Sequence, residues 1–481
     1  MPARRGPIAP KPQRSFKDWL QRVLEKAKGV QKGFDPNAVH DLRVAVRHCR
    51  AVARSIEPLD DGAKWGKMSR AAKKLLDAMG GLRDAHVIKK TITKVGMKQS
   101  VSGESVIAAM DQQEKKAKRR ARKKLQSFDR KRWRDWMHEL PNRAARVRPD
   151  GLVAELLVLD QWNDAWVRHQ AAMKSRSRVE IHKLRIGIKR LRYATESFLP
   201  ERYRKWAKDL QKLQDLLGNA HDMDVLRQEL AKIRPALSKA ERKQWASKIQ
   251  EHRAPKLREY RKLKGKWDAW RAELSQGERL DQARAEWLAV WAGFLDPDPN
   301  ASRRVARIAL SMYDGLDAAG LAATHMDSGR GLLEAAALTR HVASSAGKHR
   351  RKATYKMILR HDPPPGWTSG DMEIIAQIAR LHHGALPDRK HGFRASIARQ
   401  HSGEISLLAG ILRLASALGW RDDPAVTQLK VKSRDGSVIL LATGYREVEP
   451  IASHIASARH LLELELNRPI LVEPAPGRPP E

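Results

Sequence analysis

Two stretches of this chain place histidine, arginine and lysine side chains at the spacing of one helix face. They are VHDLRVAVRHCRA, residues 39–51, and IHKLRIGIKRLRY, residues 181–193. On a helix, positions i, i+3, i+7 and i+10 fall within a stripe about 80° wide. The residues at these positions are His40, Arg43, Arg47 and Arg50 in the first stretch and His182, Arg185, Lys189 and Arg192 in the second. Such a stripe is suited to binding anions, because Arg donates paired hydrogen bonds to phosphate oxygens and Lys supplies an adjustable positive charge.

A stripe of cations has an energetic cost, since like charges one helical turn apart repel by roughly a few tenths of a kcal/mol per pair. Neither stripe contains an acidic residue that would relieve this repulsion. A single basic helix is most simply explained as a solvated surface, whereas its repetition favours a polyanion as ligand. The apolar positions of both helices, such as Leu42 and Leu184, fall on the other face and are expected to enter the core.

A second block of sequence is duplicated together with the stripes. KKLLDAMGGLRDAHV, residues 73–87, matches QKLQDLLGNAHDMDV, residues 211–225, after a loop that is shorter in the second copy. In both copies we expect an apolar helix to end near a glycine, Gly80 or Gly218, and the following aspartate to cap the next helix. The second block also brings basic pairs one turn apart, which are Arg70 with Lys74 and Lys208 with Lys212.

The charge balance limits the kinds of partner. The chain has 94 Lys and Arg against 55 Asp and Glu, a net charge of +39 and a pI near 10.6. About +35 of this excess lies in residues 1–280. Such a charge indicates a polyanionic partner, which could be nucleic acid, anionic lipid or an inorganic polyanion.

The cysteine content and hydropathy indicate the compartment. The single cysteine, Cys49, excludes an internal disulfide and a thiolate metal cluster, as is usual for a reducing cytoplasm. The start of the chain has no apolar run of the kind that a signal peptide needs, and no stretch approaches the roughly 18 apolar residues of a membrane span. We therefore expect a cytoplasmic protein with no membrane association.

The composition and periodicity predict a mainly α protein with two domains. Ala, Leu, Lys and Arg are abundant and aromatic residues make up only 5%, which favours helix over strand. The predicted parts are a disordered basic leader (1–14), a duplicated helical-bundle domain (15–275, with repeats at about 15–150 and 151–275), a linker (276–299) and a second helical domain (300–475). Near its end, LKVKS and SVILLATG alternate around RDG, which predicts a short hairpin followed by a helix in a small α/β tail.

The duplicated H-x-x-R-x-x-x-R/K-x-x-R helix, with the L-G-x-x-x-D segment and the long charged helices, resembles the CHAD domain, the conserved-histidine α-helical domain. The resemblance covers about residues 15–275. It implies two pseudo-symmetric four-helix bundles whose basic groove binds inorganic polyphosphate. The residues that would bind polyphosphate are His40, Arg43, Arg47, Arg50, Arg70, Lys74, Arg83, His182, Arg185, Lys189, Arg190, Arg192, Lys208 and Lys212. The Arg-Asp pair that the family carries after the glycine is present as Arg83-Asp84, but the second copy has His221-Asp222.

The region of about residues 300–475 resembles the C-terminal region of exopolyphosphatase and guanosine pentaphosphate phosphatase, an HD-type helical domain with a small α/β tail. The similar segments are LLEAAALTRHVASSAGKHRRKATYKMI, IARLHHGALP and LLAGILRLASALGW. A metal-dependent HD hydrolase needs an adjacent His-Asp pair to hold a divalent ion. This chain has Arg340-His341 at that place, and Ser416 where a later Asp is expected. We therefore predict a degenerate HD-like domain with no metal site, no catalytic residues and no cofactor.

The basic residues of this second domain are candidates for accessory phosphate contacts. They are Arg340, His349, Arg350, Arg351, Lys352, Arg380, His382 and His383. The alternative is a packed domain without a ligand of its own, which could form a homodimer.

Together these patterns predict non-enzymatic binding of inorganic polyphosphate, at polyphosphate granules in the cytoplasm. Two alternatives remain open at this point. One is a nucleic-acid-binding basic protein, although the stripes lack the interleaved aromatics of a single-strand platform. The other is a phosphohydrolase that acts on polyphosphate or a guanosine nucleotide through the HD-like domain.

Overall fold

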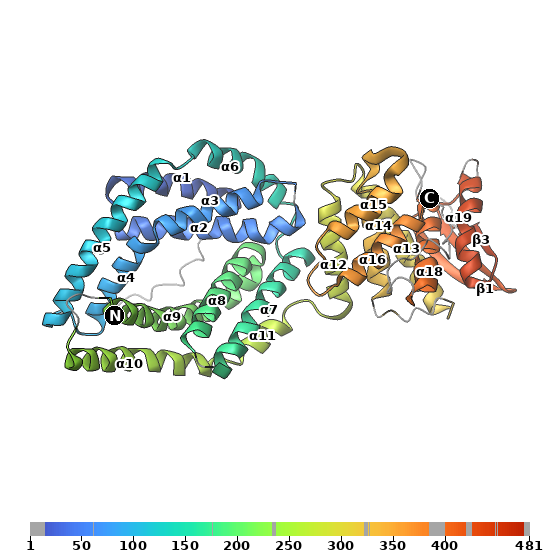
Figure 1. The fold of residues 1–481 in the computed structure, drawn as a ribbon. Helices are drawn as coiled ribbons and strands as arrows, with labels where there is room; N and C mark the ends of the chain where they lie inside the picture. The colour runs from blue at the N-terminus through green and yellow to red at the C-terminus, as the bar shows by residue number, and fades with distance from the viewer. Residues whose placement is uncertain are drawn as a thin grey trace, which may run out of the picture. The chain divides into compact units, whose positions relative to one another are not determined.

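The chain divides into two structural units (Figure 1). The computed structural model describes residues 15–60, 62–175, 177–232, 237–321, 326, 328–383, 400–419, 426–447, 449 and 451–475. The described residues up to Ser275 form the first unit, and those from Gln276 onward form the second. Helices dominate both, which confirms the mainly α prediction, while the predicted leader at 1–14 lies outside the described residues.

The first unit contains two consecutive sets of helices. The first set is α1 (Phe16–Gly33), α2 (Pro36–Ile56), α3 (Trp65–Ala78), α4 (Gly80–Lys94), α5 (Val101–Gln126) and α6 (Arg130–Ala144). The second set is α7 (Leu152–Ser175), α8 (Arg178–Phe198), α9 (Pro200–Leu230), α10 (Lys239–Lys262) and α11 (Lys266–Ala272). Figure 1 shows α2 and α3 on one side of the unit and α8 and α9 on the other.

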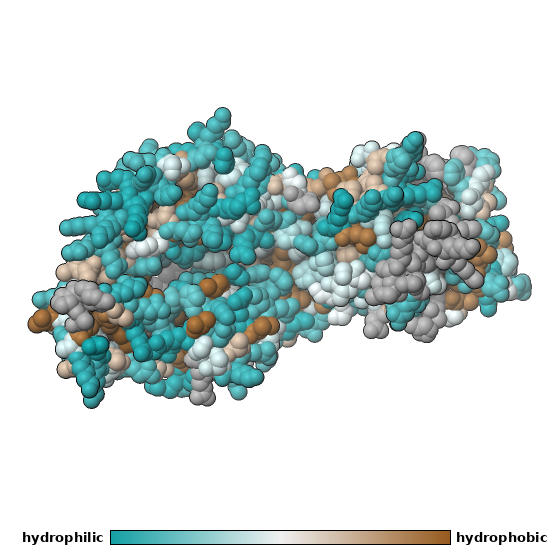
Figure 2. All heavy atoms as spheres, viewed as in Figure 1, coloured by the Kyte–Doolittle hydropathy of each residue, from teal (hydrophilic) through white to brown (hydrophobic). Residues whose placement is uncertain are grey.

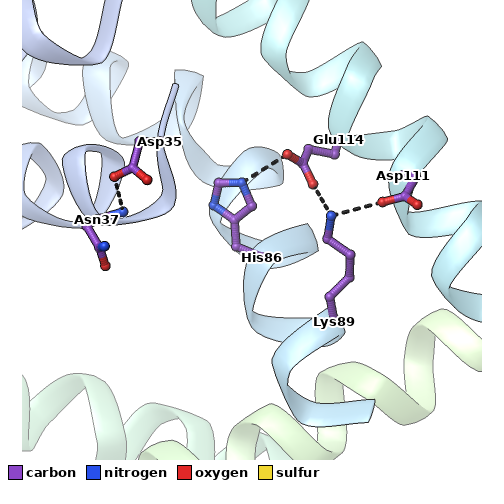
Figure 3. Close-up of polar contacts among 6 residues, drawn as sticks. All are labelled: Asp35, Asn37, His86, Lys89, Asp111 and Glu114. Carbon is purple, nitrogen blue, oxygen red and sulfur yellow. Dashed lines mark hydrogen bonds and ion pairs between the residues drawn. The ribbon is translucent and has the colours of Figure 1, made fainter. Parts of the chain in front are cut away.

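Side-chain caps fix where the two basic helices begin. The Asp35 carboxylate accepts a hydrogen bond from the backbone N–H of Asn37 at 2.8 Å, just before Pro36 starts α2 (Figure 3). At the start of α8 the Ser177 hydroxyl accepts from the backbone N–H of Glu180 at 3.1 Å. Such caps satisfy backbone donors that have no partner within the helix, so the residues of each stripe keep a defined position.

The duplicated second block folds differently in the two repeats. In the first repeat a break at Met79 separates α3 from α4, as predicted near Gly80. In the second repeat the predicted break at Gly218 is wrong, because α9 continues through it to Leu230. A glycine inside a helix costs only about 1 kcal/mol relative to alanine, and the buried Leu217 and Ala220 on either side outweigh that cost. Consequently Asp84 and Asp222 lie inside helices and do not act as caps.

One hydrophobic cluster joins the two repeats. It contains Ile88, Ile92, Val95, Met97, Val106 and Met110 from the first repeat and Met223, Leu226, Leu237, Trp245 and Ile249 from the second. The Trp245 indole N–H donates to the Ser102 hydroxyl at 3.1 Å, and the Lys94 ammonium donates to the Asn219 side-chain oxygen at 2.6 Å. This shared core fixes the helices of one repeat relative to those of the other.

A network of charged side chains links α4 to α5 in the first repeat (Figure 3). His86 Nε2 lies 3.3 Å from a Glu114 carboxylate oxygen, and Lys89 donates to Asp111 at 2.9 Å and also to Glu114. Burial lowers the pKa of His86, while the Glu114 charge acts in the opposite direction. The network holds the long basic helix α5 against the bundle.

The second unit is a layer of helices followed by a small sheet. Its elements are α12 (Gly277–Ala292), α13 (Pro299–Ala318), α14 (Gly329–Thr339), a 3-10 segment (Ser344–His349), α15 (Arg350–Arg360), α16 (Ser369–Leu381), α18 (Ser402–Leu418), β1 (Gln428–Arg434), β2 (Ser437–Thr443), α19 (Ile451–Leu466) and β3 (Ile470–Pro474). The predicted linker at 276–299 is wrong, since α12 occupies most of it and packs on α14. The buried Trp287, Leu288 and Trp291 explain why this segment joins the core.

The C-terminal tail has the predicted hairpin and helix. β1 pairs with β2 antiparallel through Asp435 and Gly436, whose φ angles of 49° and 74° are the left-handed conformations of a tight hairpin turn. β2 then pairs with β3 in parallel, with α19 as the connection between them. Helix α19 packs on α18, where an added Cβ at Gly410 would lie only 3.0 Å from the backbone nitrogen of Leu462, so glycine permits this close approach.

Candidate anion-binding groove

A cavity of about 980 Å³ lies between the two repeats of the first unit, lined by α2, α3, α4, α8 and α9. We call it the central groove. The predicted binding residues that line it are His40, Arg43, Arg47, Arg50, Arg83, His182, Arg185, Lys189 and Arg190. Thus both basic stripes face one cavity.

The Nε–H donors of three arginines in the wall of the central groove lack hydrogen-bond partners among the described residues. Arg43 donates through Nη1 to the Leu76 carbonyl oxygen at 2.6 Å. The Nε atoms of Arg43, Arg50 and Arg185 are buried, and none has a hydrogen-bond partner among the described residues. A buried donor without a partner costs about 1–3 kcal/mol, so packing these three Nε–H groups into the groove wall has an energetic cost.

Burial and the crowding of positive charge lower the pKa values of basic side chains in the groove. Burial, together with the charges of Arg185 and Arg47, lowers the pKa of Lys189 to about 6. Burial lowers the pKa of Arg43 to about 10, with a further contribution from Arg47. Burial also lowers the pKa of His40, which faces Arg83 and Arg47. Hence Lys189 is largely uncharged in the empty groove at neutral pH.

Two aspartates partly balance these cations. Burial raises the pKa of both Asp84 and Asp222, while nearby basic groups act in the opposite direction. The largest of those basic contributions comes from Arg43 for Asp84 and from Arg185 for Asp222. The lining also includes Asp77 and Asp215, but its basic residues outnumber these four carboxylates. The groove therefore keeps a positive charge.

His182 and His221 form a contact that the sequence did not predict. Their Nδ1 atoms lie 3.3 Å apart and their ring centroids 4.6 Å apart. Burial and the charge of Arg185 lower the pKa of His221 to about 3, and burial with Arg185 and Lys189 lowers that of His182. Both rings are thus largely neutral at pH 7, so a short contact between their nitrogens is tolerated. His221 occupies the position that Arg83 holds in the first repeat.

Other lining residues were also missed from the sequence. Arg54 lies one helical turn beyond Arg50, so the stripe spacing could have identified it. Tyr193 and Gln214 gave no comparable signal, because neither continues a basic pattern.

Five predicted residues lie elsewhere in the first unit. Arg70 and Lys74 face a different cavity, on the other side of α3. Arg192 donates to the Tyr203 hydroxyl at 3.3 Å and to Gln214 at 3.2 Å, so it is held beside the groove. The remaining two are exposed on α9, where Lys208 faces solvent and Lys212 pairs with Glu259 at 3.2 Å. The structure does not bring these five side chains into the central groove.

In the second unit, two predicted phosphate contacts are buried. Arg340 donates to the Ala337 carbonyl oxygen at 2.7 Å, and His382 Nδ1 lies 2.6 Å from the Ala379 carbonyl oxygen. Their exposed fractions are only 5% and 6%, because both sit at the ends of core helices. This burial argues against the predicted accessory phosphate contacts at Arg340 and His382.

The other predicted residues of the second unit are more accessible. His349, Arg350, Arg351 and Lys352 are exposed around the start of α15. Arg380 lies over the Tyr355 ring at 5.6 Å, and the His383 ring is 3.8 Å from that of His382. Within the described ranges, no group of three or more His, Cys, Asp or Glu side chains is arranged to hold a metal ion. Every helix in those ranges is also too short or too polar for a membrane span.

Comparison with known proteins gives two family matches. Residues 15–231 match the CHAD domain, and residues 295–466 match Ppx/GppA phosphatase, domain III, as the two resemblances implied. Among solved structures, the crystal structure of the CHAD domain from the plant Ricinus communis matches with 21% sequence identity and a TM-score of 0.37. That match covers 56% of this chain and 96% of the other. The comparison with curated proteins found no match.

Proposed function

This chain carries a CHAD domain followed by a Ppx/GppA phosphatase domain III region, and on that premise we propose that it binds inorganic polyphosphate in the central groove without hydrolysing it. Both regions belong to families associated with polyphosphate. Domain III is a non-catalytic region of the phosphatases, which fits an accessory role for the second unit. Attachment to polyphosphate granules follows from this proposal.

The observation that carries the proposal is that basic side chains of both stripes line one cavity. Arg43, Arg47 and Arg50 come from the first repeat, and Arg185 and Lys189 come from the second. A linear polyphosphate offers several anionic oxygens at every unit, so one chain could satisfy donors from α2 and α8 together.

The physical basis of such binding is largely electrostatic. A polyanion that enters the groove releases condensed counterions, so affinity should fall steeply with salt. Nucleic acid would release counterions in the same way. Among the described residues that line the groove, however, the one Phe, Tyr or Trp side chain is Tyr193, and it is buried. The groove thus lacks the stacking surface that single-strand binding uses.

The test is competitive binding of long-chain polyphosphate against single-stranded and duplex DNA at physiological salt. The variant Arg47→Gln/Arg83→Gln removes two groove charges and relieves repulsion, so the fold should be retained. Arg119→Gln/Arg258→Gln is the matched control, because it removes the same charge at exposed positions outside the groove. Circular dichroism of all three proteins checks their helicity.

We expect polyphosphate to outcompete DNA by at least about tenfold, and the groove variant to lose about tenfold in affinity with a salt slope smaller by about two. The control should stay within about threefold of wild type. Stronger binding of DNA, or a groove variant that binds polyphosphate as well as the control does, would reject the proposal.

A further inference from the structure

A second basic cavity, of about 920 Å³, lies on the first repeat between α3, α5 and α6. We call it the lateral cavity. Its cationic lining residues are Lys67, Arg70, Lys74, Arg120, Lys123, Lys124 and Arg132. Asp77 and Asp129 are its only acidic lining residues within the described chain. Figure 2 shows the predominantly hydrophilic surface over α5 and α6.

The cations of the lateral cavity are largely unpaired. Arg132 pairs with Asp129 at 3.2 Å, and that carboxylate also caps α6 by accepting from the Arg132 backbone N–H at 2.9 Å. The other six basic side chains form no ion pair with any described residue. A solvated stabilising surface would instead interleave acidic partners. The excess charge is therefore available to a ligand.

The floor of the lateral cavity is apolar and made of packed aromatic rings. Trp133 and Trp136 line it at 2% and 1% exposure, with their rings edge to face at 5.4 Å, and Phe128 packs beside them. Because these aromatic side chains carry no hydrogen-bond acceptors, they do not bind the Lys and Arg side chains that line the cavity. The floor also excludes water from one side, which strengthens the attraction of an anion to the rim.

Helix α3 separates the lateral cavity from the central groove. Leu76 and Gly80 line the central groove, Leu75 and Gly81 line the lateral cavity, and Asp77 lines both. Since a helix with its side chains is about 10–12 Å across, an extended anion could pass from one cavity to the other around the end of α3. This arrangement also accounts for Arg70 and Lys74, which belong to the duplicated basic pattern but lie outside the central groove.

We propose that the lateral cavity is a second binding site for a phosphate chain, and that one long chain occupies both cavities by crossing α3. This inference rests on the proposed function of the central groove. Linking two sites through one ligand makes the second binding event intramolecular, so long chains gain affinity without any new kind of contact. Short chains bind each cavity separately.

The test is calorimetric titration of the full chain with tripolyphosphate and with long-chain polyphosphate. Arg120→Glu/Lys123→Glu alters the lateral cavity. Lys115→Glu/Arg119→Glu is its matched control, because it changes one Lys and one Arg at exposed positions of the same helix that do not line either cavity. Circular dichroism and thermal unfolding check that both variants fold.

We expect the lateral variant to bind one tripolyphosphate fewer than wild type, and to lose at least about tenfold in affinity for long chains. The control should bind as many tripolyphosphate molecules as wild type and lose less than about threefold. Equal stoichiometry and equal long-chain affinity in the two variants would overturn the lateral site while leaving the central groove in place. Conversely, Arg47→Gln/Arg83→Gln tests the groove alone, so the two failures are distinguishable.

Discussion

Lys189 of the second repeat shares one cavity with Arg47 of the first. Burial, then the charges of Arg185 and Arg47, hold the pKa of Lys189 at about 6, well below its ordinary value of 10.5. The two repeats thus combine their charge at a buried lysine that is mostly neutral when the groove is empty. A bound polyanion reverses this balance, since added negative charge favours the protonated ammonium.

Polyphosphate binding should therefore take up a proton. At pH 8 the free Lys189 is neutral and the bound one charged, so titration in buffers of different ionisation enthalpy should report uptake of up to one proton. The groove histidines contribute little at this pH, because burial lowers the pKa of His40, His182 and His221. Affinity should accordingly rise as the pH falls from 9 toward 6, within the range set by Lys189.

The variant Lys189→Gln should bind without this proton uptake. Lys183→Gln is the control, because Lys183 is exposed on the same helix and pairs with Glu180 at 2.7 Å. It should behave as wild type. A heat of binding independent of the buffer in the wild-type protein would show that Lys189 does not change its protonation.

The same lysine should make stability depend on pH. Between about pH 6 and 10.5 the unfolded chain binds a proton that the folded chain does not, so the free energy of unfolding rises with pH across this window. Below pH 6 both states are protonated and this contribution no longer changes. Lys189→Met should remove the dependence and raise the free energy of unfolding at pH 7 by about 1–4 kcal/mol, as when apolar residues replace buried charges.

Denaturant unfolding of wild type and Lys189→Met at several pH values measures this effect. The difference between the two proteins should be largest near pH 6 and should vanish toward pH 10.5. A constant difference across the series would mean that the side chain is charged in the folded protein throughout.

The sequence predicted much of the fold because its signals were repeated. The stripe spacing alone placed His40 to Arg50 and His182 to Arg192 on two helices, and nine of the predicted residues line the central groove. The prediction of a linker at 276–299 was wrong. The segment begins with polar residues, so its sequence did not indicate that Trp287 and Trp291 would be buried. Local polarity does not reveal which face a neighbouring helix covers.

The rest of the site depends on tertiary packing. Arg70 and Lys74 follow the duplicated basic pattern, yet the position of α3 between two cavities separates them from Arg43. Likewise, Arg340 has the sequence context of a ligand position, but the helix end that carries it is buried. Periodicity assigns residues to a face of their own helix, whereas the neighbouring helices decide which cavity that face lines.

Asp224 should be important for the stability of the first unit. It occupies the position equivalent to His86, is 7% exposed, and accepts from Arg253 Nε at 2.9 Å while also pairing with Arg178 at 3.1 Å. Asp224→Ala leaves Arg253, whose side chain is only 11% exposed, without its carboxylate, so the free energy of unfolding should fall by about 3 kcal/mol. The more exposed pair between Asp209 and Lys266, 3.0 Å apart, serves as the comparison.

Denaturant unfolding of the two alanine variants gives the contrast. Asp209→Ala should cost less than about 1 kcal/mol, because an exposed ion pair is screened by solvent. An equal loss of unfolding free energy in the two variants would indicate that the ion pairs of Asp224 with Arg253 and Arg178 are no better shielded from water than the surface pair.

Finally, divalent metal ions should not produce phosphate release from polyphosphate. In the correspondence predicted from the resemblance to HD hydrolases, Arg340 and His341 stand in place of the His-Asp pair. Burial lowers the pKa of Arg340 to about 10, and Asp296 and Asp298 act in the opposite direction, so the group remains a cation at neutral pH. Burial and Arg340 lower the pKa of His341 to about 4. A fixed guanidinium at this position repels a divalent ion and supplies no ligand atom.

The measurement is phosphate release by the purified full chain with Mg²⁺, with Mn²⁺ and with a chelator. Equal, background rates are expected in all three conditions. His349→Ala separates a real activity from a contaminant, since His349 is exposed at the start of α15 and its loss should leave the fold intact. Metal-dependent release that disappears in His349→Ala would assign hydrolysis to the second unit, because a co-purified phosphatase would be unaffected by that substitution.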